Sequence, residues 1–371
     1  MAINSLQRCV MSSLVASAFV SGLVATPRLE AADDNLAVEL RVAAEGMAKA
    51  LKGLGESTIA IGQFTGPPQL AASGGPGIAY RLSVELEKLK IKVKLQSRYG
   101  VDGRFRIVLD KQSQEYALEV RGEVSDLAGT VVFRFRRASF GETGLARLSG
   151  VGGTDLPPQA PRKERVSIII ERLPKPTTTC RGTLIQSSPQ SPYAIEVLTL
   201  DGVSQKFRPL TPRLEENLAF VNIKRDQAYV IRLVNRSDHD AAVALYIDGL
   251  SMFTFSKKID YTRVIIPRRS VGLIRGWHRD NRESNEFLVT SYAKSPAARI
   301  LQNTSNIGTV TAMFSAAWDN EKDRPRDEPK VDRRKKSINA TGVGQRVSAN
   351  YTEVNRYSGV IRSIVSVRYS R

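Results

Sequence analysis

The sequence predicts an α+β protein of two domains, an N-terminal α/β sheet domain with two helices and a C-terminal antiparallel β-sandwich. The chain has 371 residues, 42% hydrophobic and 25% charged, which suffices for packed cores and suggests about two domains. Its first part combines two helical patterns with strand patterns, whereas the part beyond residue 192 holds mostly short apolar runs typical of strands. Sequence rich in Gly and Pro separates the two parts.

Residues 1–32 have the pattern of a secretory signal peptide. Arg8 precedes an apolar run of small residues at 10–25, and acidic residues follow the run. The run is about 16 residues long, short of the roughly 20 that a membrane-spanning helix needs. Three cleavage positions fit the pattern, after Ala25, Ala31 or Ala32. We therefore expect an exported protein of the periplasm, the cell envelope or the extracellular space, with no transmembrane span in the mature chain.

The few cysteines and histidines limit the chemistry of the chain. It has two of each, so we expect neither a metal site nor a cofactor. Cys9 lies before the apolar run, which is the wrong order for a lipid-attachment cysteine. Removal of the signal peptide leaves Cys180 alone, so no intramolecular disulfide can form, and we expect Cys180 to be an inert small residue.

Residues 33–145 form the expected α/β domain. Apolar residues at three- and four-residue steps predict one helix at 36–51 and another at 78–89. The segment 58–64, with Ile59, Ile61 and Phe64, predicts a buried strand between these helices. Further strands are expected at 91–95, 104–110, 116–125 and 130–137. The turn sequence at 126–129 predicts that the last two strands form an antiparallel hairpin.

Residues 146–192 are the expected linker, because Gly, Pro and basic residues flank its one apolar stretch at 166–170. The β-sandwich is then expected over residues 193–371. Its predicted strands are 194–200, 229–235, 242–248, 263–267, 271–277, 286–292 and 307–316.

The last part of the expected β-sandwich has three further features. A helix is predicted at 295–301. The segment 321–336 carries many charges of both signs and almost no large apolar residue, so we expect a solvated loop. Strands at 346–355 and 360–369 are expected to close the sandwich as a hairpin across 357–359.

Residues 36–140 carry a set of motifs with a known parallel. These are a strand at 59–64 that ends in Phe64, the segment 98–105, and a hairpin at 126–129 that completes a V-x-D-x-x-G pattern beginning at Val124. They resemble the periplasmic α/β domain shared by curli-secretion, flagellar outer-membrane and penicillin-binding-protein-activator lipoproteins. The chain departs from that family because it lacks the lipid-attachment cysteine and the pore-forming insertions. The resemblance implies a non-catalytic envelope domain that docks on other proteins.

A second set of motifs runs from about residue 229 to the end of the chain. The motifs are Asn-Arg-Ser at 235–237, the segments 246–253, 276–278, 286–287 and 307–310, and Ser-Val-Arg-Tyr at 366–369. They resemble an uncharacterised family of exported bacterial proteins, those of planctomycetes included. The resemblance implies the β-sandwich fold and export, and it implies no activity.

The excess of basic residues is the main hint of a partner. Lys and Arg number 55 against 37 Asp and Glu, a formal net charge of +18, which favours an anionic partner or surface. Alternation in the strand 130–137 places phenylalanines on one face and Arg134 and Arg136 on the other, as a cationic strip. A second basic cluster surrounds Trp277, with Arg268, Arg269, Arg275, Arg279 and Arg282.

The predicted binding residues are Arg134, Arg136, Arg275, Trp277 and His278. Each has an alternative interpretation. The arginines could form a solvated face without a ligand. Trp277 could be a core or edge aromatic that follows a strand, with its polar neighbours turned to solvent.

We expect an exported, non-catalytic binding or scaffold protein of the cell envelope that docks on a protein or on an anionic glycan or lipid surface. No catalytic residue is assigned, and whether the chain is an enzyme stays open. One alternative is an exported hydrolase that uses Asp248, His278 or Glu286 at one end of the β-sandwich, which requires these side chains to converge. Another is an extracytoplasmic binder of nucleic acid or a different anionic polymer, although export argues against nucleic acid.

Overall fold

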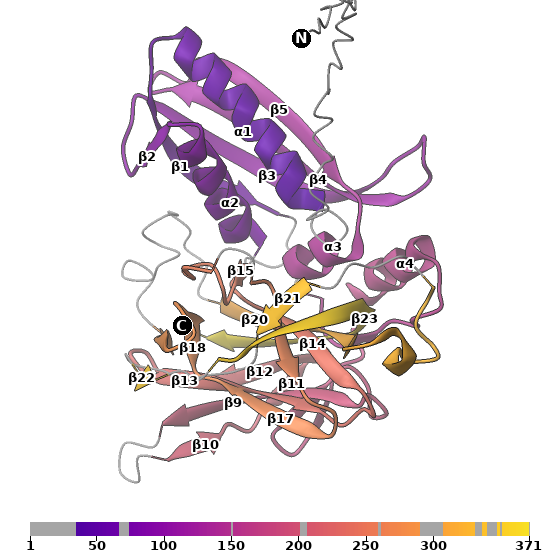
Figure 1. Cartoon of the computed structure of the whole chain (residues 1–371). Coiled ribbons are helices and arrows are strands. Elements are labelled where there is room, and N and C mark those ends of the chain that lie inside the picture. The colour runs from indigo at the N-terminus through magenta and orange to yellow at the C-terminus, as the bar shows by residue number, and fades with distance from the viewer. Residues whose placement is uncertain are drawn as a thin grey trace, which may run out of the picture.

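The computed structural model describes residues 35–66, 74–149, 151–200, 206–258, 261–289, 307–330, 336–339, 347–348 and 351–370. The expected signal peptide, Cys9, the helix expected at 295–301 and part of the expected charged loop, 331–335, lie outside these residues. Strands predominate in the described chain, which also holds four α-helices (Figure 1). The α+β class is therefore confirmed.

An α/β layer forms the N-terminal end of the described chain (Figure 1). Its strands are β1 (Thr58–Thr65), β2 (Lys92–Lys94), β3 (Tyr99–Leu109), β4 (Tyr116–Asp126) and β5 (Val131–Ser139). They form one sheet in the order β2-β1-β3-β4-β5, in which β1 is parallel to both neighbours and the other pairs are antiparallel. Helices α1 (Asn35–Gly53) and α2 (Gly74–Lys88) cover one face of this sheet. Both expected helices and the expected hairpin are confirmed.

The apolar face of α1 explains how closely this helix lies against the sheet. Its periodic apolar residues, among them Leu40 and Met47, are fully buried. Gly46 lies beneath the ring of Phe133 of β5, and a Cβ atom at Gly46 would stand 2.6 Å from the ring. A side chain at this position would therefore push the helix and the sheet apart.

Asp126 holds the turn of the β4–β5 hairpin. Its Oδ1 atom accepts hydrogen bonds from the backbone N–H groups of Ala128 and Thr130, with N to O distances of 2.9 and 2.8 Å. Gly129 takes a positive φ of 84°, which glycine adopts without steric cost. The turn thus sets which residues of β4 and β5 lie opposite each other.

Two nine-stranded sheets make up most of the remaining described chain (Figure 1). The first consists of β7 (Thr179–Arg181), β8 (Leu184–Gln186), β9 (Tyr193–Leu200), β10 (Phe207–Pro209), β13 (Ala228–Asn235), β17 (Ser270–Ile274), β18 (Gly276–His278), β19 (Glu283–Leu288) and β22 (Val347–Ser348). Its main path is β18-β19-β13-β9-β8-β7, while β10 pairs with β9, β17 with β13 and β22 with β19.

The second nine-stranded sheet consists of β6 (Thr154–Asp155), β11 (Arg213–Glu215), β12 (Leu218–Asn222), β14 (Asp240–Ile247), β15 (Leu250–Ser251), β16 (Val264–Ile266), β20 (Ile307–Trp318), β21 (Lys336–Asn339) and β23 (Glu353–Ser370). Its main path is β11-β12-β23-β20-β14-β16-β21. The strands expected from residue 194 to 316 are present, with shifted ends, although residues 290–292 of the one expected at 286–292 lie outside the described residues. The one expected at 271–277 is divided at Arg275 into β17 and β18.

The expected linker at 146–192 folds into regular structure. It holds the end of α3 (Glu142–Ser149), α4 (Arg162–Arg172) and the strands β6, β7 and β8, which pair within the two nine-stranded sheets. Pro161 is the N-cap of α4, where the missing N–H costs no helical hydrogen bond. The helix then buries Val166 and Ile169. At this position proline begins a helix instead of marking an extended connection.

The hairpin expected across 357–359 is wrong. β23 is a single strand of 18 residues. Tyr357 and Ser358 pair with β20 as part of this strand. The carboxylate of Glu328 lies over Gly359, and a Cβ atom there would stand 2.4 Å from a carboxylate oxygen. Glycine at position 359 therefore lets the Glu328 carboxylate approach the strand closely, and it does not form a turn.

The charged segment is only partly a solvated loop. Its start is the exposed 3-10 turn η4 (Glu321–Asp323). Glu328, in contrast, is buried and binds the guanidinium group of Arg362 at 3.0 Å, and Asp327 binds the same group at 2.7 Å. The sequence pattern predicted that these charges are exposed. Their partner Arg362 lies far along the chain on β23, so the local sequence gives no sign of the pairing.

Most buried apolar residues of the three sheets belong to one large continuous cluster, while Ala242, Ile265 and Ala317 form a small second one. The two nine-stranded sheets meet through aromatic side chains, such as Tyr193 of β9, which stacks on Phe314 of β20 with ring centres 4.9 Å apart. The α/β layer contacts them through α3, where Arg147 Nε donates a hydrogen bond to the carbonyl oxygen of Gly249 at 2.9 Å. In the described part of the chain, no helix combines the length and apolar composition needed to cross a bilayer.

Candidate functional site

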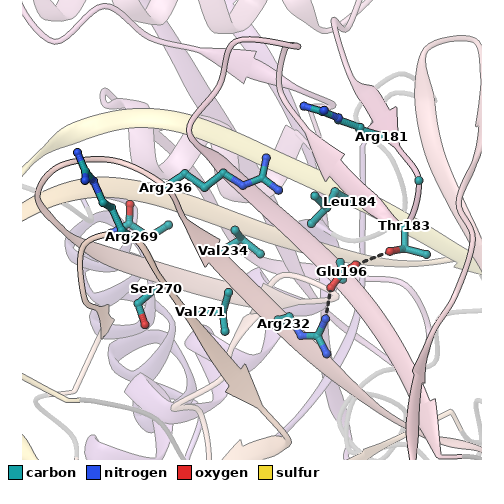
Figure 2. Close-up of a pocket in the computed structure, with 12 residues that line it drawn as sticks. Arg181, Thr183, Leu184, Glu196, Arg232, Val234, Arg236, Arg269, Ser270 and Val271 are labelled. Atoms are coloured by element: carbon teal, nitrogen blue, oxygen red, sulfur yellow. Dashed lines mark hydrogen bonds and ion pairs between the residues drawn. The ribbon is translucent and has the colours of Figure 1, made fainter.

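A hollow of about 650 Å³ lies on the first nine-stranded sheet (Figure 2). It crosses β8, β9, β13 and β17 and is bounded by the turn between β7 and β8 and by the turn before β17. Four arginines and one carboxylate line it, and we call it the arginine hollow. Its lining residues are Arg181, Gly182, Thr183, Leu184, Glu196, Arg232, Val234, Asn235, Arg236, Arg269, Ser270 and Val271.

A fixed ion pair forms part of the floor of the arginine hollow. Glu196 of β9 and Arg232 of β13 lie directly opposite each other, and Arg232 Nη1 is 2.6 Å from Glu196 Oε2. The hydroxyl group of Thr183 donates a hydrogen bond to Oε1 of the same carboxylate (Figure 2). Because side chains alternate along a strand, the neighbouring Ile195 and Leu233 point into the core. The pair is thus anchored from both strands.

The arginine hollow has an excess of positive charge. Four guanidinium groups against one carboxylate leave a net charge of +3 among its lining residues. Arg269 also lies 2.6 Å from Asp238, but both side chains are well exposed, so this pair is weak. Arg181 and Arg236 are exposed and have no acidic partner among the described residues. Their donors are available to an anion.

Arg134 and Arg136 lie outside the arginine hollow, on the face of the five-stranded sheet that α1 and α2 leave uncovered. The predicted separation of faces is confirmed, since both arginines are exposed while Phe135 is buried on the opposite face. Arg134 contacts Glu123, and Arg136 contacts Glu119. Their role in binding stays a prediction.

The predicted binding residues Arg275, Trp277 and His278 also lie outside the arginine hollow, whereas Arg269 of the predicted basic cluster lines it. Arg275 stacks its guanidinium group over Phe207, 5.3 Å from the ring centre. Trp277 is buried and packs edge to face against Phe255 and Phe287, which confirms its interpretation as a core aromatic. Its neighbour His278, expected to face solvent under that interpretation, is fully buried.

His278 occupies an aromatic environment. Its ring packs against Phe253, Tyr261 and Tyr351, and its Nδ1 atom lies 2.9 Å from the hydroxyl oxygen of Ser256. Burial lowers the pKa of His278 to about 4, despite the opposing influence of Asp280. The imidazole is therefore neutral near pH 7 and has no direct access to solvent.

The three side chains of the hydrolase alternative have separate surroundings. Asp248 accepts hydrogen bonds from the backbone N–H of Thr309 at 2.9 Å and from the hydroxyl group of Tyr369 at 3.1 Å. His278 is buried as described, and Glu286 is partly exposed on β19. None of the three lines the arginine hollow.

Sequence reasoning missed most of the arginine hollow, although part of its signal was present. Glu196 and Arg232 are single charged residues within two predicted strands that are otherwise almost entirely apolar. That pattern indicates two side chains on the outer face of a sheet. Arg181 and Arg236 lie at strand ends, where no sequence pattern indicates that the chain brings them together.

Within the described residues, no group of three or more His, Cys, Asp or Glu is arranged to hold a metal ion. Cys180 of β7 is half-buried, and burial raises the pKa of its thiol. In comparisons with known proteins, no family model, no curated protein and no solved structure matches the chain significantly. The function is therefore inferred from the residues of the chain itself.

Proposed function

We propose that this chain is a non-catalytic binding or scaffold protein that holds an anionic partner in the arginine hollow. The observation that carries the proposal is the pair Arg181 and Arg236, two exposed guanidinium groups that border one hollow without an acidic partner among the described residues. Guanidinium groups bind carboxylate, sulfate and phosphate through paired N–H donors. An anionic ligand that lies in the hollow can therefore contact both arginines.

The rest of the lining favours an anionic glycan. Leu184, Val234 and Val271 supply apolar surface between the arginines, against which the C–H face of a sugar ring can pack (Figure 2). The carboxylate of Glu196 and the hydroxyl of Ser270 offer acceptors for sugar hydroxyl groups. A ligand that combines anionic groups, hydroxyl groups and apolar faces therefore matches the arginine hollow best.

Variants of Arg181 and Arg236 test this proposal. We expect R181A/R236A to weaken binding of polygalacturonate, a carboxylate glycan, by about tenfold or more, because two charge-assisted contacts are lost. The matched control is K224A/R225A, which removes two exposed cations from the turn before β13. Binding is measured by isothermal titration at low salt. Equal losses of affinity in the two double variants would show that only the net charge matters. That result would contradict a site in the arginine hollow.

Export belongs to the same proposal. The apolar run at 10–25 supports a signal peptide, and the resemblances support an envelope location, a docking role for the α/β part and a division into an α/β domain and a β-sandwich. Mass spectrometry of the protein from its native cells tests export. A mature N-terminus after Ala25, Ala31 or Ala32 is expected, and an intact N-terminal segment would contradict it.

The alternatives make different predictions. A hydrolase needs Asp248, His278 and Glu286 around one substrate, and their separate surroundings give this alternative no support. A general binder of anionic polymers would retain nucleic acid as strongly as an acidic glycan and would lose both steeply as salt rises. Competition between single-stranded DNA and polygalacturonate distinguishes such a binder from a glycan site.

A further inference from the structure

The uncovered face of the five-stranded sheet carries charged side chains in cross-strand rows. The register places Arg104 of β3 opposite Arg121 of β4, and Arg121 opposite Arg136 of β5. Neighbouring strands lie about 4.8 Å apart, so three arginines span about 10 Å across the sheet. Like charges directly opposite each other destabilise a sheet. This row is therefore unfavourable unless other charges compensate for it.

Glu119 of β4 provides part of that compensation. Its Oε1 atom accepts hydrogen bonds from Arg106 Nε at 2.9 Å and from Arg121 Nε at 2.7 Å, and its Oε2 atom accepts one from Arg136 Nε. Glu119 is only 1% exposed, whereas the three arginine side chains are each at least 50% exposed. The carboxylate thus lies beneath three guanidinium groups, which we call the Glu119 cluster.

The Glu119 cluster stays charged at neutral pH. Burial alone would raise the pKa of Glu119, but hydrogen bonds from Arg121, Arg106 and Arg136 offset this and hold the pKa below its usual value. Three cations and one anion leave a net charge of +2. Each guanidinium group contacts the carboxylate through Nε, and its Nη atoms form no hydrogen bond among the described residues. Several N–H donors therefore face solution in a fixed arrangement.

We propose that the Glu119 cluster is a second anion site, separate from the arginine hollow, which binds one discrete phosphate group. Three guanidinium groups oriented by a buried carboxylate supply converging donors for a tetrahedral oxyanion. The adjacent row favours a discrete group over a uniformly charged polymer. It contains Asp102 opposite Glu123 and, beyond Glu123, its partner Arg134, so this row has a net charge of −1 and repels a continuous polyanion.

The direction in which one substitution changes the affinity for phosphate distinguishes this site from a simple basic surface. Glu119→Gln removes a negative charge, so long-range electrostatics alone predicts tighter phosphate binding. The proposed site predicts weaker binding, by about tenfold, because the three guanidinium groups lose the carboxylate that orients them. The matched control is Glu123→Gln, which removes the same charge from an exposed residue that contacts Arg134. This control is expected to bind phosphate at least as tightly as the parent protein.

The experiment uses the full chain with the R181A/R236A double substitution, so that the arginine hollow contributes little. Inorganic phosphate is titrated while the arginine Nε–Hε signals are followed by NMR. Arg121→Gln serves as a second variant, because it removes one donor and leaves Glu119 two partners. Weaker binding in both variants, with Glu123→Gln unimpaired, is the expected result.

Three outcomes would overturn the proposal. These are unchanged or tighter binding in Glu119→Gln, no saturable shift up to about 20 mM phosphate, and binding to phosphatidylglycerol vesicles that depends on Glu119 while free phosphate does not bind. The last outcome would assign the face to a lipid surface. None of them bears on the glycan affinity of the arginine hollow, so failure here and failure of the proposed function can be told apart.

Discussion

Arg165 is the largest fully buried side chain of the described residues, and it connects three elements. It lies in α4, binds both carboxylate oxygens of Glu142 in α3 at 2.7 and 2.6 Å, and donates hydrogen bonds to the carbonyl oxygens of Pro157 and of Ile361 in β23. A buried charge is tolerated only when its partners are complete. Arg165 thus holds the helical segment between the sheets in place.

Replacing Arg165 by methionine is expected to lower the free energy of unfolding by about 3–5 kcal/mol, because it leaves the carboxylate of Glu142 and two carbonyl oxygens without their donor. Urea denaturation followed by circular dichroism measures this change. Arg172→Met, at the exposed end of α4, is the control and should change the free energy by less than about 0.5 kcal/mol. Similar values for the two variants would contradict the role assigned to Arg165.

His278 is expected to make stability dependent on pH. Its pKa is about 4 in the folded chain and near 6.5 in the unfolded chain, so between these values the unfolded chain binds more protons. The stabilising contribution is complete above about pH 6.5 and is lost as the pH falls toward 4. Urea denaturation at pH 7.5, 6 and 5 should show a steeper loss in the parent protein than in His278→Phe. Parallel losses would show that His278 does not titrate in this way.

For single side chains, the alternation along strands was predictable and the depth of burial was not. The pattern around Arg134 and Arg136 correctly placed them opposite Phe135. The same reasoning missed the burial of His278, because Phe253 and Tyr351, which enclose it, come from distant parts of the chain. Local sequence carries no signal for such contacts.

The pairing of β18 with β19 depends on a glycine. Gly276 lies opposite Glu286, and a Cβ atom at Gly276 would stand 2.0 Å from the backbone oxygen of Asn285. A backbone oxygen cannot move aside as the end of a side chain can. The two strands can therefore approach closely only with glycine at this position, and their pairing positions Trp277 and His278 in the core.

We expect Gly276→Ala to destabilise the protein by about 1–3 kcal/mol, because the new methyl group forces β18 away from β19. Thermal unfolding measured by calorimetry provides the comparison. Gly53→Ala, at the end of α1, has open space around the new methyl group and should be neutral or stabilising by up to about 1 kcal/mol. An unchanged melting temperature for Gly276→Ala would contradict the close approach.

At the element scale, periodicity predicted the helices α1 and α2 and most of the strands. It failed where a residue typical of turns serves another purpose. Pro161 begins α4, and Gly359 makes room for the Glu328 carboxylate inside β23. In both cases a tertiary contact decided the local structure, and composition alone indicated a break.

At the scale of the whole molecule, the three sheets are connected through their helices as well as their core. Besides Arg147 of α3, the hydroxyl group of Tyr80 in α2 donates a hydrogen bond to the carbonyl oxygen of Thr254 at 2.9 Å. Burial raises the pKa of Tyr80, so this hydroxyl keeps its proton at neutral pH. The division of the chain into two domains was predicted from composition, and composition carries no information about such contacts between distant segments.

The net charge of +18 is a property of the whole chain, and the structure places part of it in defined positions. It indicated an anionic partner without locating it. Many arginines are paired with carboxylates, as Arg362 is with Asp327 and Glu328. Arg181 and Arg236 lack an acidic partner among the described residues and border the same hollow, and this combination distinguishes the arginine hollow from that general background.

The salt dependence of glycan binding tests the arginine hollow most directly. The logarithm of the affinity for polygalacturonate should fall linearly with the logarithm of the salt concentration, since each ion pair releases counterions. In R181A/R236A the slope should be smaller by about 1–2, one unit or less for each lost contact, and in K224A/R225A it should be unchanged. An equal slope in the parent protein and R181A/R236A would contradict the account, because Arg181 and Arg236 would then make no contact with the ligand.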